Sequence, residues 1–390
     1  MDGMLATLQS AGFSRVMIAP VDWRHPTPWI RLGAHEVVPP LLSVGDAPSW
    51  MRRVKPALLA HAIRTIVSAR LSGGGAASDA YRRADVIVSA GGAYLGGSKP
   101  GINLIKLANL RAGVGAGRPT LTAPITVNPS SRLVRSLMRW GCASVTLFVR
   151  DAPSRETLLA MGLSSDLVPD MALRARTLVQ QSAPLAARRA ASGVIGWAPR
   201  AYRADHNKWG DPRAAEQAVM VAMERLLETT ELRLRLIAQV RAAADDDDRL
   251  TVDRIALGLG KRFGSRIDVA DDVDSLDDAI GRYASLDALV TSRMHAALFA
   301  LGAGTPAVAV AYEPKVAGVM ADLGLADRVL PASSEVTPDA VLRQIRRLLE
   351  PREIERTRDA FVAAQGRFDA FDRALASIAT RAGHASEPRS

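Results

Sequence analysis

Short runs of β-branched and aliphatic residues alternate with longer helical patterns along this chain of 390 residues. Strands that are separated by helices usually pair in parallel, because each helix carries the chain back across a face of the sheet. The pattern therefore predicts an α/β protein whose parallel sheets are covered by helices. The expected strands are Val16–Pro20, Val86–Ala90, Thr120–Pro124, Ser144–Val149, Val194–Trp197, Arg233–Ile237, Ala288–Thr291 and Ala307–Ala311.

Chain length and one change of composition indicate two domains. A chain of 390 residues is too long for one ordinary hydrophobic core. Residues 180–192 are rich in Ala, Arg, Ser and Pro and separate the two series of strands, so we interpret them as a linker. We expect Rossmann-like domains at 1–180 and 192–345 and a helical tail at 346–390. The two domains are expected to face each other across a cleft, beyond the carboxyl ends of their strands.

Charge and cysteine content limit the partners of this protein. The net charge is +10, but Lys and Arg do not gather in a block with aromatic residues, so nucleic acid is not an expected partner. The single cysteine, Cys142, leaves no internal disulfide and fits a reducing, cytoplasmic setting, and the N-terminus has no signal-peptide pattern. No pair of His residues has metal-ligand spacing, so we expect no metal site. The acidic run Asp245–Asp248 is interpreted as a solvated loop, in preference to a metal cage.

One apolar helix–turn–strand unit in the second half is bracketed by polar residues. Ser292 is expected to be the N-cap of its helix, which places Arg293 and His295 in the first turn. Helix N-termini expose unpaired N–H groups and attract anions. A lone His on a helix is more often a packing residue, but its place beside Arg293 at the helix entry favours binding or proton transfer. Glu313 and Lys315 end the following strand, where Lys315 is either a site residue or a solvated loop lysine.

Two segments of the first half could also contribute to a binding site. Gly91 and Gly92 follow an expected strand, where glycine lets the backbone approach a ligand, although such a pair is as often only a tight turn. Arg150 ends another strand, so its planar guanidinium could hold a carboxylate or a phosphate. The alternative is a surface or capping role for Arg150 and Asp151.

Several short motifs occur together between residues 85 and 330. The most specific are Ser-Arg-x-His-Ala at Ser292–Ala296 and Tyr-Glu-Pro-Lys at Tyr312–Lys315. With these two motifs the chain resembles the polysaccharide pyruvyl transferase family. Supporting motifs are Asp85–Ala93, Phe148–Asp151, Pro169–Asp170 and Gly304–Pro306.

The resemblance implies an architecture and a reaction. Members of that family are similar to GT-B glycosyltransferases, with two Rossmann-like domains, and transfer pyruvate from phosphoenolpyruvate to a sugar as a cyclic ketal with release of phosphate. It implies that His295 is the essential acid or base, and that Arg150, Arg293 and Lys315 belong to the donor site. We place Ser292, Glu313, Gly91 and Gly92 in the substrate site as well.

The same resemblance sets expectations about partners and cofactors. Phosphoenolpyruvate is the expected donor substrate, and neither a cofactor nor a metal is expected. The acceptor is a sugar or a lipid-linked oligosaccharide of an envelope or exopolysaccharide glycan. A basic protein also suits peripheral contact with the inner face of the membrane that carries such lipids.

The beginning of the chain departs from the family pattern. Family members open with a strand and a Gly-x-x-Asn-x-Gly-Asp turn, whereas residues 1–12 here have the pattern of the helix that follows that turn. We therefore expect this part of the site to be absent, through either an upstream start or a true loss. Two alternatives to pyruvyl transfer stay open: a nucleotide-sugar glycosyltransferase on the same scaffold, and a degenerate member that binds glycan without turnover.

Overall fold

A computed structural model shows two compact units. The first unit holds residues 1–175 and 367–390, and the second holds residues 176–366. Both are built from parallel strands and helices, as the alternating pattern predicts. The expected linker, 180–192, lies outside the described residues except for Ser192. The described residues are 2–19, 35–42, 56–90, 92–97, 100–175, 192–202, 211–240, 247–272 and 275–383.

The second unit contains a six-stranded sheet in the order β11-β10-β9-β12-β13-β14, with every neighbouring pair parallel. Counted along the chain from β9, this is the order 3-2-1-4-5-6 of the doubly wound Rossmann fold. The order reverses between β9 and β12, and sheets of this kind bind ligands beyond the carboxyl ends of the strands at that point. The strands are β9 (Val194–Ala198), β10 (Arg233–Leu236), β11 (Ile267–Val269), β12 (Ala288–Thr291), β13 (Ala307–Ala311) and β14 (Val329–Pro331).

Four of these strands, β9, β10, β12 and β13, confirm the expectations for the second half of the chain. The pattern does not predict β11 and β14, because each has only three residues, and β11 holds Asp268 while β14 ends in Pro331. Both are edge strands, where a polar residue such as Asp268 or a proline such as Pro331 is tolerated.

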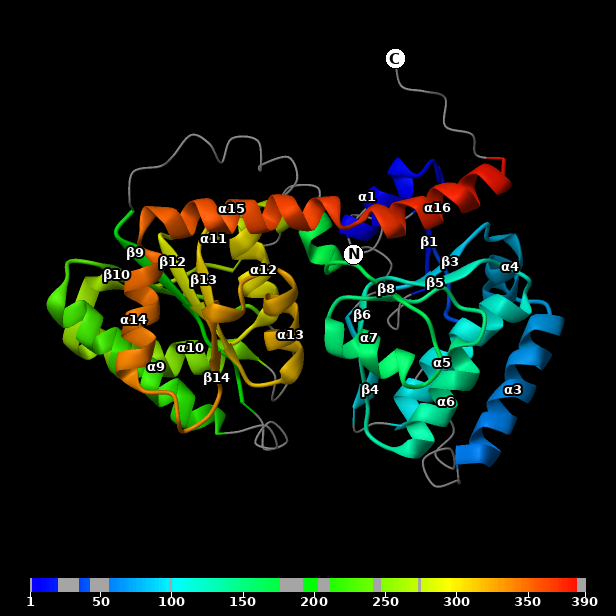
Figure 1. Cartoon of the computed structure of the whole chain (residues 1–390), viewed down its shortest axis with the longest axis horizontal. Coiled ribbons are helices and arrows are strands. Elements are labelled where there is room, and N and C mark those ends of the chain that lie inside the picture. Colours follow the sequence, from blue (N-terminus) through cyan, green and yellow to red (C-terminus); the bar gives the residue numbers. More distant parts are fainter. Residues whose placement is uncertain are drawn as a thin grey trace, which may run out of the picture. The chain divides into compact units, whose positions relative to one another are not determined.

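Helix α14 of the second unit buries one apolar face, whereas α12 is buried on nearly all sides. In α14 the buried residues Val341, Leu342, Ile345 and Leu348 recur at helical spacing, and Thr337 caps its first turn. Helix α15 packs on both α12 and α14 (Figure 1). The helices are α9 (Pro212–Thr229), α10 (Asp248–Phe263), α11 (Leu276–Ala284), α12 (Met294–Gly302), α13 (Pro314–Asp322), α14 (Pro338–Leu348) and α15 (Pro351–Gly366).

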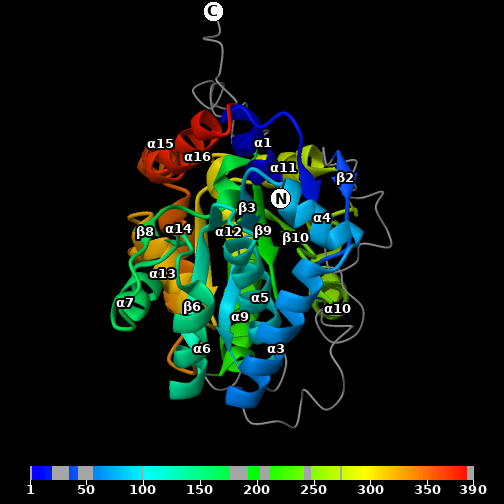
Figure 2. The same cartoon turned by 90° about the vertical axis from the view of Figure 1, so that its right-hand side faces the viewer.

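The first unit also has parallel strands, most of which have only two or three residues. The expected strands of the first half contain β1 (Met17–Ile18), β3 (Ile87–Ser89), β5 (Thr120–Thr122) and β7 (Phe148–Val149), the last much shorter than predicted. Helix α5 packs between α3 and α6, and the three lie side by side in Figures 1 and 2. The other elements are α1 (Asp2–Ser10), β2 (Glu36–Val37), α3 (Pro56–Ser72), α4 (Ala76–Arg83), β4 (Gly92–Gly97), α5 (Pro100–Gly115), β6 (Ile125–Pro129), α6 (Arg132–Cys142), α7 (Ala152–Leu159), β8 (Asp166–Leu167) and α16 (Asp369–Arg381).

The glycine-rich segment after β3 is a strand, so the prediction of a turn there is wrong. Gly92 begins β4, which pairs with β6, and Gly91 lies outside the described residues. Gly96 has φ +128°, and a Cβ atom at this position would lie 2.2 Å from the carbonyl oxygen of Asn128. This glycine therefore serves the close approach of β4 to β6, a contact that a single sequence does not reveal.

The C-terminal segment does not form a separate tail as expected, because its two helices belong to different units. Helix α15 is part of the second unit, and α16 is part of the first. Phe371 of α16 packs edge-on against Phe148, with ring centroids 4.9 Å apart. Arg174 lies over the Phe368 ring and pairs with Asp372 at 2.5 Å. The apolar spacing of α16 predicts a helix, but it does not say which core the helix joins.

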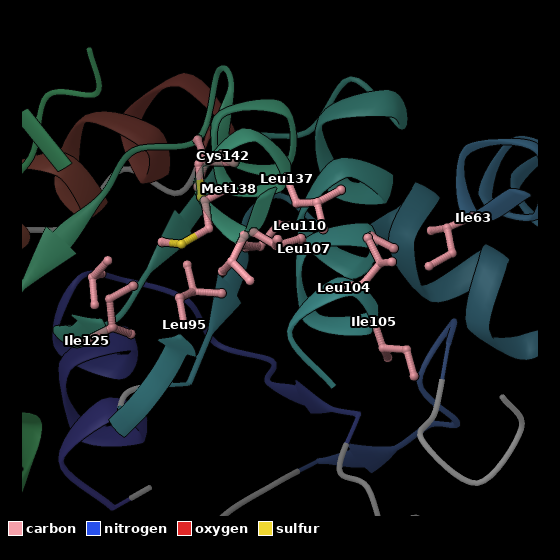
Figure 3. Packing of buried hydrophobic residues seen from close by; sticks show 14 of the residues in the cluster. Ile63, Leu95, Leu104, Ile105, Leu107, Leu110, Ile125, Leu137, Met138 and Cys142 are labelled. Atoms are coloured by element: carbon pink, nitrogen blue, oxygen red, sulfur yellow. The ribbon is translucent and has the colours of Figure 1, made fainter. Parts of the chain in front are cut away.

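The core of the first unit surrounds the single cysteine. Apolar side chains from α3, α5, α6 and the strands β4 and β6 pack together, and Cys142 lies next to Met138 in this cluster (Figure 3). The Cys142 side chain is buried, and burial raises the pKa of its thiol from 9.0 to about 12. The thiol is therefore protonated throughout the neutral range.

We expect Cys142 to resist thiol reagents in the folded protein, because the thiolate is the reactive form and the side chain is inaccessible. The measurement is the rate of reaction with a disulfide reagent at mildly alkaline pH, with and without urea. Because the chain has one cysteine, the signal has one source. Reaction of the native protein at the rate of the unfolded protein would contradict the buried position.

Candidate functional site

The site residues expected in the second half lie at the carboxyl edge of the second unit's sheet, in the loops after two strands and in the first turns of the helices that follow. Ser292 and His295 follow β12, and Glu313 and Lys315 follow β13, its neighbour in the sheet. Because the strands are parallel, both loops lie at the same edge. Strand β12 also borders β9, where the strand order reverses. These loops thus occupy the position at which doubly wound sheets bind ligands.

Side chains around the end of β9 fix the start of α12. The Thr291 hydroxyl donates to the carbonyl oxygen of Ala198 at 3.0 Å and accepts from the Arg293 N–H at 2.9 Å. Arg293 is the N-cap residue, so the prediction that Ser292 caps this helix is wrong. The Ser292 hydroxyl is instead 2.9 Å from the Tyr202 hydroxyl, which donates to it. Burial raises the pKa of Tyr202 above its usual value, against the effect of this hydrogen bond, so the phenol keeps its proton.

Arg293, which the resemblance places in the donor site, points to a carboxylate of the protein itself. Its Nε donates to Oδ2 of Asp248 at 2.9 Å, and its Nη2 donates to Oδ1 at 2.5 Å. Arg293 is 7% exposed and Asp248 is fully buried. The pair has the fork-to-fork geometry of a strong arginine–carboxylate contact. Its positive charge is therefore balanced within the protein.

The acidic run before α10 is likewise not a solvated loop where the structure describes it. Asp247 and Asp248 are both buried. Asp247 caps α10 by accepting from the Arg249 N–H at 3.0 Å. Asp248 accepts from the backbone N–H groups of Ala201 and Val240, each at 2.9 Å. A run of four acidic residues resembles a solvated segment in sequence, because its buried partners are distant in the chain.

His295 lies in the first turn of α12 and its side chain is exposed. Its ring lies beside that of Phe299, one turn further along, with centroids 6.4 Å apart and planes 30° apart. The neighbouring residues of this helix, Met294 and Ala296, are buried. His295 is thus the residue by which this apolar helix presents an ionisable group at the edge of the sheet.

Two cations flank the ring of Tyr312 in the loop after β13. Lys315 pairs with Glu313 at 2.5 Å, and its Nζ lies 5.9 Å from the centre of the Tyr312 ring. The Arg200 guanidinium carbon lies 4.1 Å from the same centre, and its Nη1 donates to the Tyr312 hydroxyl. Sequence reasoning missed Arg200. The available signal was its position two residues after the buried strand β9.

Two neighbouring helices at this edge begin without a side-chain cap. Among the described helices of the second unit that follow strands, α12 and α13 have N-cap residues whose side chains make no capping hydrogen bond. The positive ends of these two helix dipoles therefore lie at this edge and attract anions. In α13 the first residue, Pro314, has no N–H, and the Val316 N–H donates to the carbonyl oxygen of Glu313 at 3.1 Å. The N-caps that do make such a bond are Asp211 of α9, Asp247 of α10, Ser275 of α11 and Thr337 of α14.

Arg150, predicted for the donor site, is an internal residue of the first unit. It is 2% exposed, forms an ion pair with Asp170, and donates from Nε to the Thr126 hydroxyl at 2.8 Å. Asp151 caps α7 by accepting from the Ser154 N–H at 2.9 Å. The alternative of a capping role is thus confirmed for Asp151, while Arg150 links β6 to the segment after β8.

Neither a metal site nor a membrane span is found within the described residues. In them, no three or more His, Cys, Asp and Glu side chains are grouped so that they could hold a metal ion. The described helices are all too short or too polar to cross a membrane.

The fold is that of the GT-B glycosyltransferases and epimerases. A UDP-N-acetylglucosamine 2-epimerase from Neisseria meningitidis, solved with UDP-GlcNAc bound, matches with a TM-score of 0.56 over 98% of this chain and 96% of its own, at 11% identity. The trehalose 6-phosphate synthase of Burkholderia multivorans matches with a TM-score of 0.51 over 86% and 79% of the two chains, at 13% identity. The glycotransferase of kitacinnamycin matches with a TM-score of 0.54 over 99% and 95%, also at 13% identity.

Among proteins with this fold, the sequence of the chain matches one family. The model of the polysaccharide pyruvyl transferase family matches residues 3–314, which include the loops after β9 and β12 and end at Pro314, the first residue of α13. This chain belongs to the polysaccharide pyruvyl transferase family. No curated protein matches it.

Proposed function

We propose that this protein transfers pyruvate from phosphoenolpyruvate to a sugar of an envelope or exopolysaccharide glycan, with release of phosphate. Family membership supports a transferase that acts on a glycan. The observation that carries the proposal is the pair of uncapped helices, α12 and α13, beside the point where the strand order reverses. One helix has His295 in its first turn, and the other has Lys315.

The donor fits the charges at this edge of the sheet. Phosphoenolpyruvate carries a phosphate and a carboxylate, so it requires two groups of N–H donors or cations. The positive ends of the α12 and α13 helix dipoles lie at this edge, and Arg200 and Lys315 bring positive charge to Tyr312, where a donor anion would compete with Glu313 for Lys315. We assign to Arg200 the donor contact that the resemblance implies for Arg293 and Arg150, because the guanidinium groups of those two residues face Asp248 and Asp170.

His295 is assigned the proton transfers. A first sugar hydroxyl adds to C2 of phosphoenolpyruvate while a proton reaches its methylene carbon, which becomes a methyl group. A second hydroxyl then displaces phosphate from C2, and its proton leaves with the phosphate. Imidazole can accept and return a proton near neutral pH, and the exposed ring of His295 is accessible to a substrate.

The test compares donors and then measures turnover. Phosphoenolpyruvate at a hundred times its Kd should stabilise the folded protein by about 2.7 kcal/mol, which raises the melting temperature. UDP-N-acetylglucosamine serves as the competing donor, because one structural neighbour binds it. Phosphate release from phosphoenolpyruvate should then depend on an acceptor sugar or lipid-linked oligosaccharide. Stabilisation by the sugar nucleotide alone would favour a glycosyltransferase, and binding of glycan without phosphate release would favour a non-catalytic member.

A further inference from the structure

Asp248 joins three loops at the carboxyl edge of the second unit's sheet. Its two oxygens accept from Ala201 in the loop after β9, from Val240 in the loop after β10, and twice from Arg293 in the loop after β12. A carboxylate has about four lone-pair positions in the plane of its oxygens, and here four donors use them. None of the site roles predicted from the sequence involves Asp248.

The contact between Asp248 and Arg293 is one that the folded protein cannot easily give up. Both side chains are buried, and a buried charge that loses its partner is strongly destabilising. If the guanidinium swung out to hold a substrate anion, Asp248 would keep its two backbone donors but lose its counter-charge. Arg293 is therefore committed to the protein interior.

The same contact sets the start of the helix that carries His295. Arg293 is the N-cap of α12, and its carbonyl oxygen accepts from the Ala297 N–H at 3.2 Å in the first turn. Its side chain is anchored on Asp248, and its backbone N–H is held by Thr291. His295 is only two residues further along. The direction in which this first turn leaves the sheet is thus fixed through Arg293.

We propose that Asp248 is a positioning residue, which acts through Arg293 to hold His295 in place, and that Arg293 does not contact the donor. The catalytic part of this proposal rests on the proposed function. The positional part does not, because the place of His295 can be observed without a substrate. Two measurements therefore test it separately.

The first measurement is the NMR resonance of the His295 imidazole C–H groups in the ligand-free protein, assigned by its loss in His295→Ala. Asp248→Asn and Arg293→Met should each shift this resonance, because each removes the anchor of the first turn. Arg293→Lys keeps the charge but not the fork, so it should produce a smaller shift. The matched control is Asp247→Asn, the adjacent buried acid that caps α10, which should leave the His295 resonance in place.

The second measurement separates kcat from the donor KM. A misplacement of about 1 Å can cost about 100-fold in rate, so Asp248→Asn and Arg293→Met should each lower kcat by about that factor with little change in the donor KM. The double variant should be no slower than the slower single variant, since both changes break one contact. It also leaves no unpaired buried charge, so it serves as the folded variant if Asp248→Asn alone unfolds.

An unshifted His295 resonance in folded Asp248→Asn or double-variant protein would overturn the positional role. A rise of the donor KM about tenfold or more in Arg293→Met, with no such rise in Asp248→Asn, would show that Arg293 contacts the donor. If the wild-type protein does not turn over phosphoenolpyruvate, the proposed function fails, whereas the resonance measurement still decides the positional role.

Discussion

Glu353→Gln should lower the free energy of unfolding of the second unit by about 3–5 kcal/mol. Glu353 is buried in α15, and its Oε2 accepts from Nη2 of Arg328 at 2.7 Å and from Nε at 3.0 Å. Arg328 is itself fully buried and donates from Nη1 to the Thr357 hydroxyl at 2.7 Å. Removal of one partner leaves the other charge buried without compensation. Because α15 packs on α12, the loss also weakens the support of the helix that carries His295.

Hydrogen exchange of peptides from β9 and β12 measures this effect in the second unit alone, which avoids the assumption that both units unfold together. Glu355→Gln is the matched control, because it makes the same change at an exposed position of the same helix. A double variant, Arg328→Met with Glu353→Met, should recover most of the stability, since no unpaired charge remains. Equal exchange in the Glu353→Gln and Glu355→Gln proteins would contradict the assignment.

The same residue ties stability to acid pH. Burial by itself raises the pKa of Glu353, but the hydrogen bonds and charges of Arg328 and Arg347 outweigh it and leave the pKa below its ordinary value of 4.5. The folded state thus binds the Glu353 proton less readily than the unfolded state. The stabilisation is present above pH 4.5 and is lost as the pH falls from there through the lowered pKa. The Glu353→Gln protein should lack this part of the acid dependence.

The sequence predicts the regular strands of this fold better than the elements that depart from the usual patterns. The apolar runs predict β9, β12 and β13, because a buried parallel strand is apolar on both faces. The alternation of Arg and Leu predicts β10, which buries one face only. The sequence does not predict β4, whose glycines resemble a turn. It does not assign α16 to the first unit either, because docking on Phe148 is a contact between residues more than 200 positions apart.

The candidate site is likewise predicted only in part. The Ser-Arg-x-His motif correctly identifies a helix entry with an exposed His295 at the carboxyl edge of a sheet. The carboxylate partners of the two predicted site arginines lie far from them in the sequence. Arg293 pairs with Asp248, 45 residues earlier, and Arg150 pairs with Asp170. An arginine next to a predicted site thus indicates positive charge in the sequence, whereas only its distant partners decide whether that charge is available to a ligand.

His295→Ala should lower kcat for phosphate release from phosphoenolpyruvate by about 100- to 10,000-fold, which is the usual contribution of a positioned acid or base. The donor KM should change little, because in the proposed site the anion is held by the N-termini of α12 and α13 and by Lys315 and Arg200. The His295 ring is exposed and contacts Phe299, so its removal leaves no buried cavity and should not unfold the protein. Circular dichroism and the melting temperature check that the variant is folded.

Two further variants separate proton transfer from other roles of His295. His295→Gln keeps hydrogen-bonding groups but cannot shuttle a proton, so it should be nearly as slow as His295→Ala. His61→Ala, which removes an exposed histidine from α3 of the first unit, should leave kcat unchanged. If His295→Ala raised the donor KM with kcat preserved, His295 would be a binding contact. The proton transfers would then belong to another group at this edge, and Tyr202, which donates to Ser292, would be the next residue to replace.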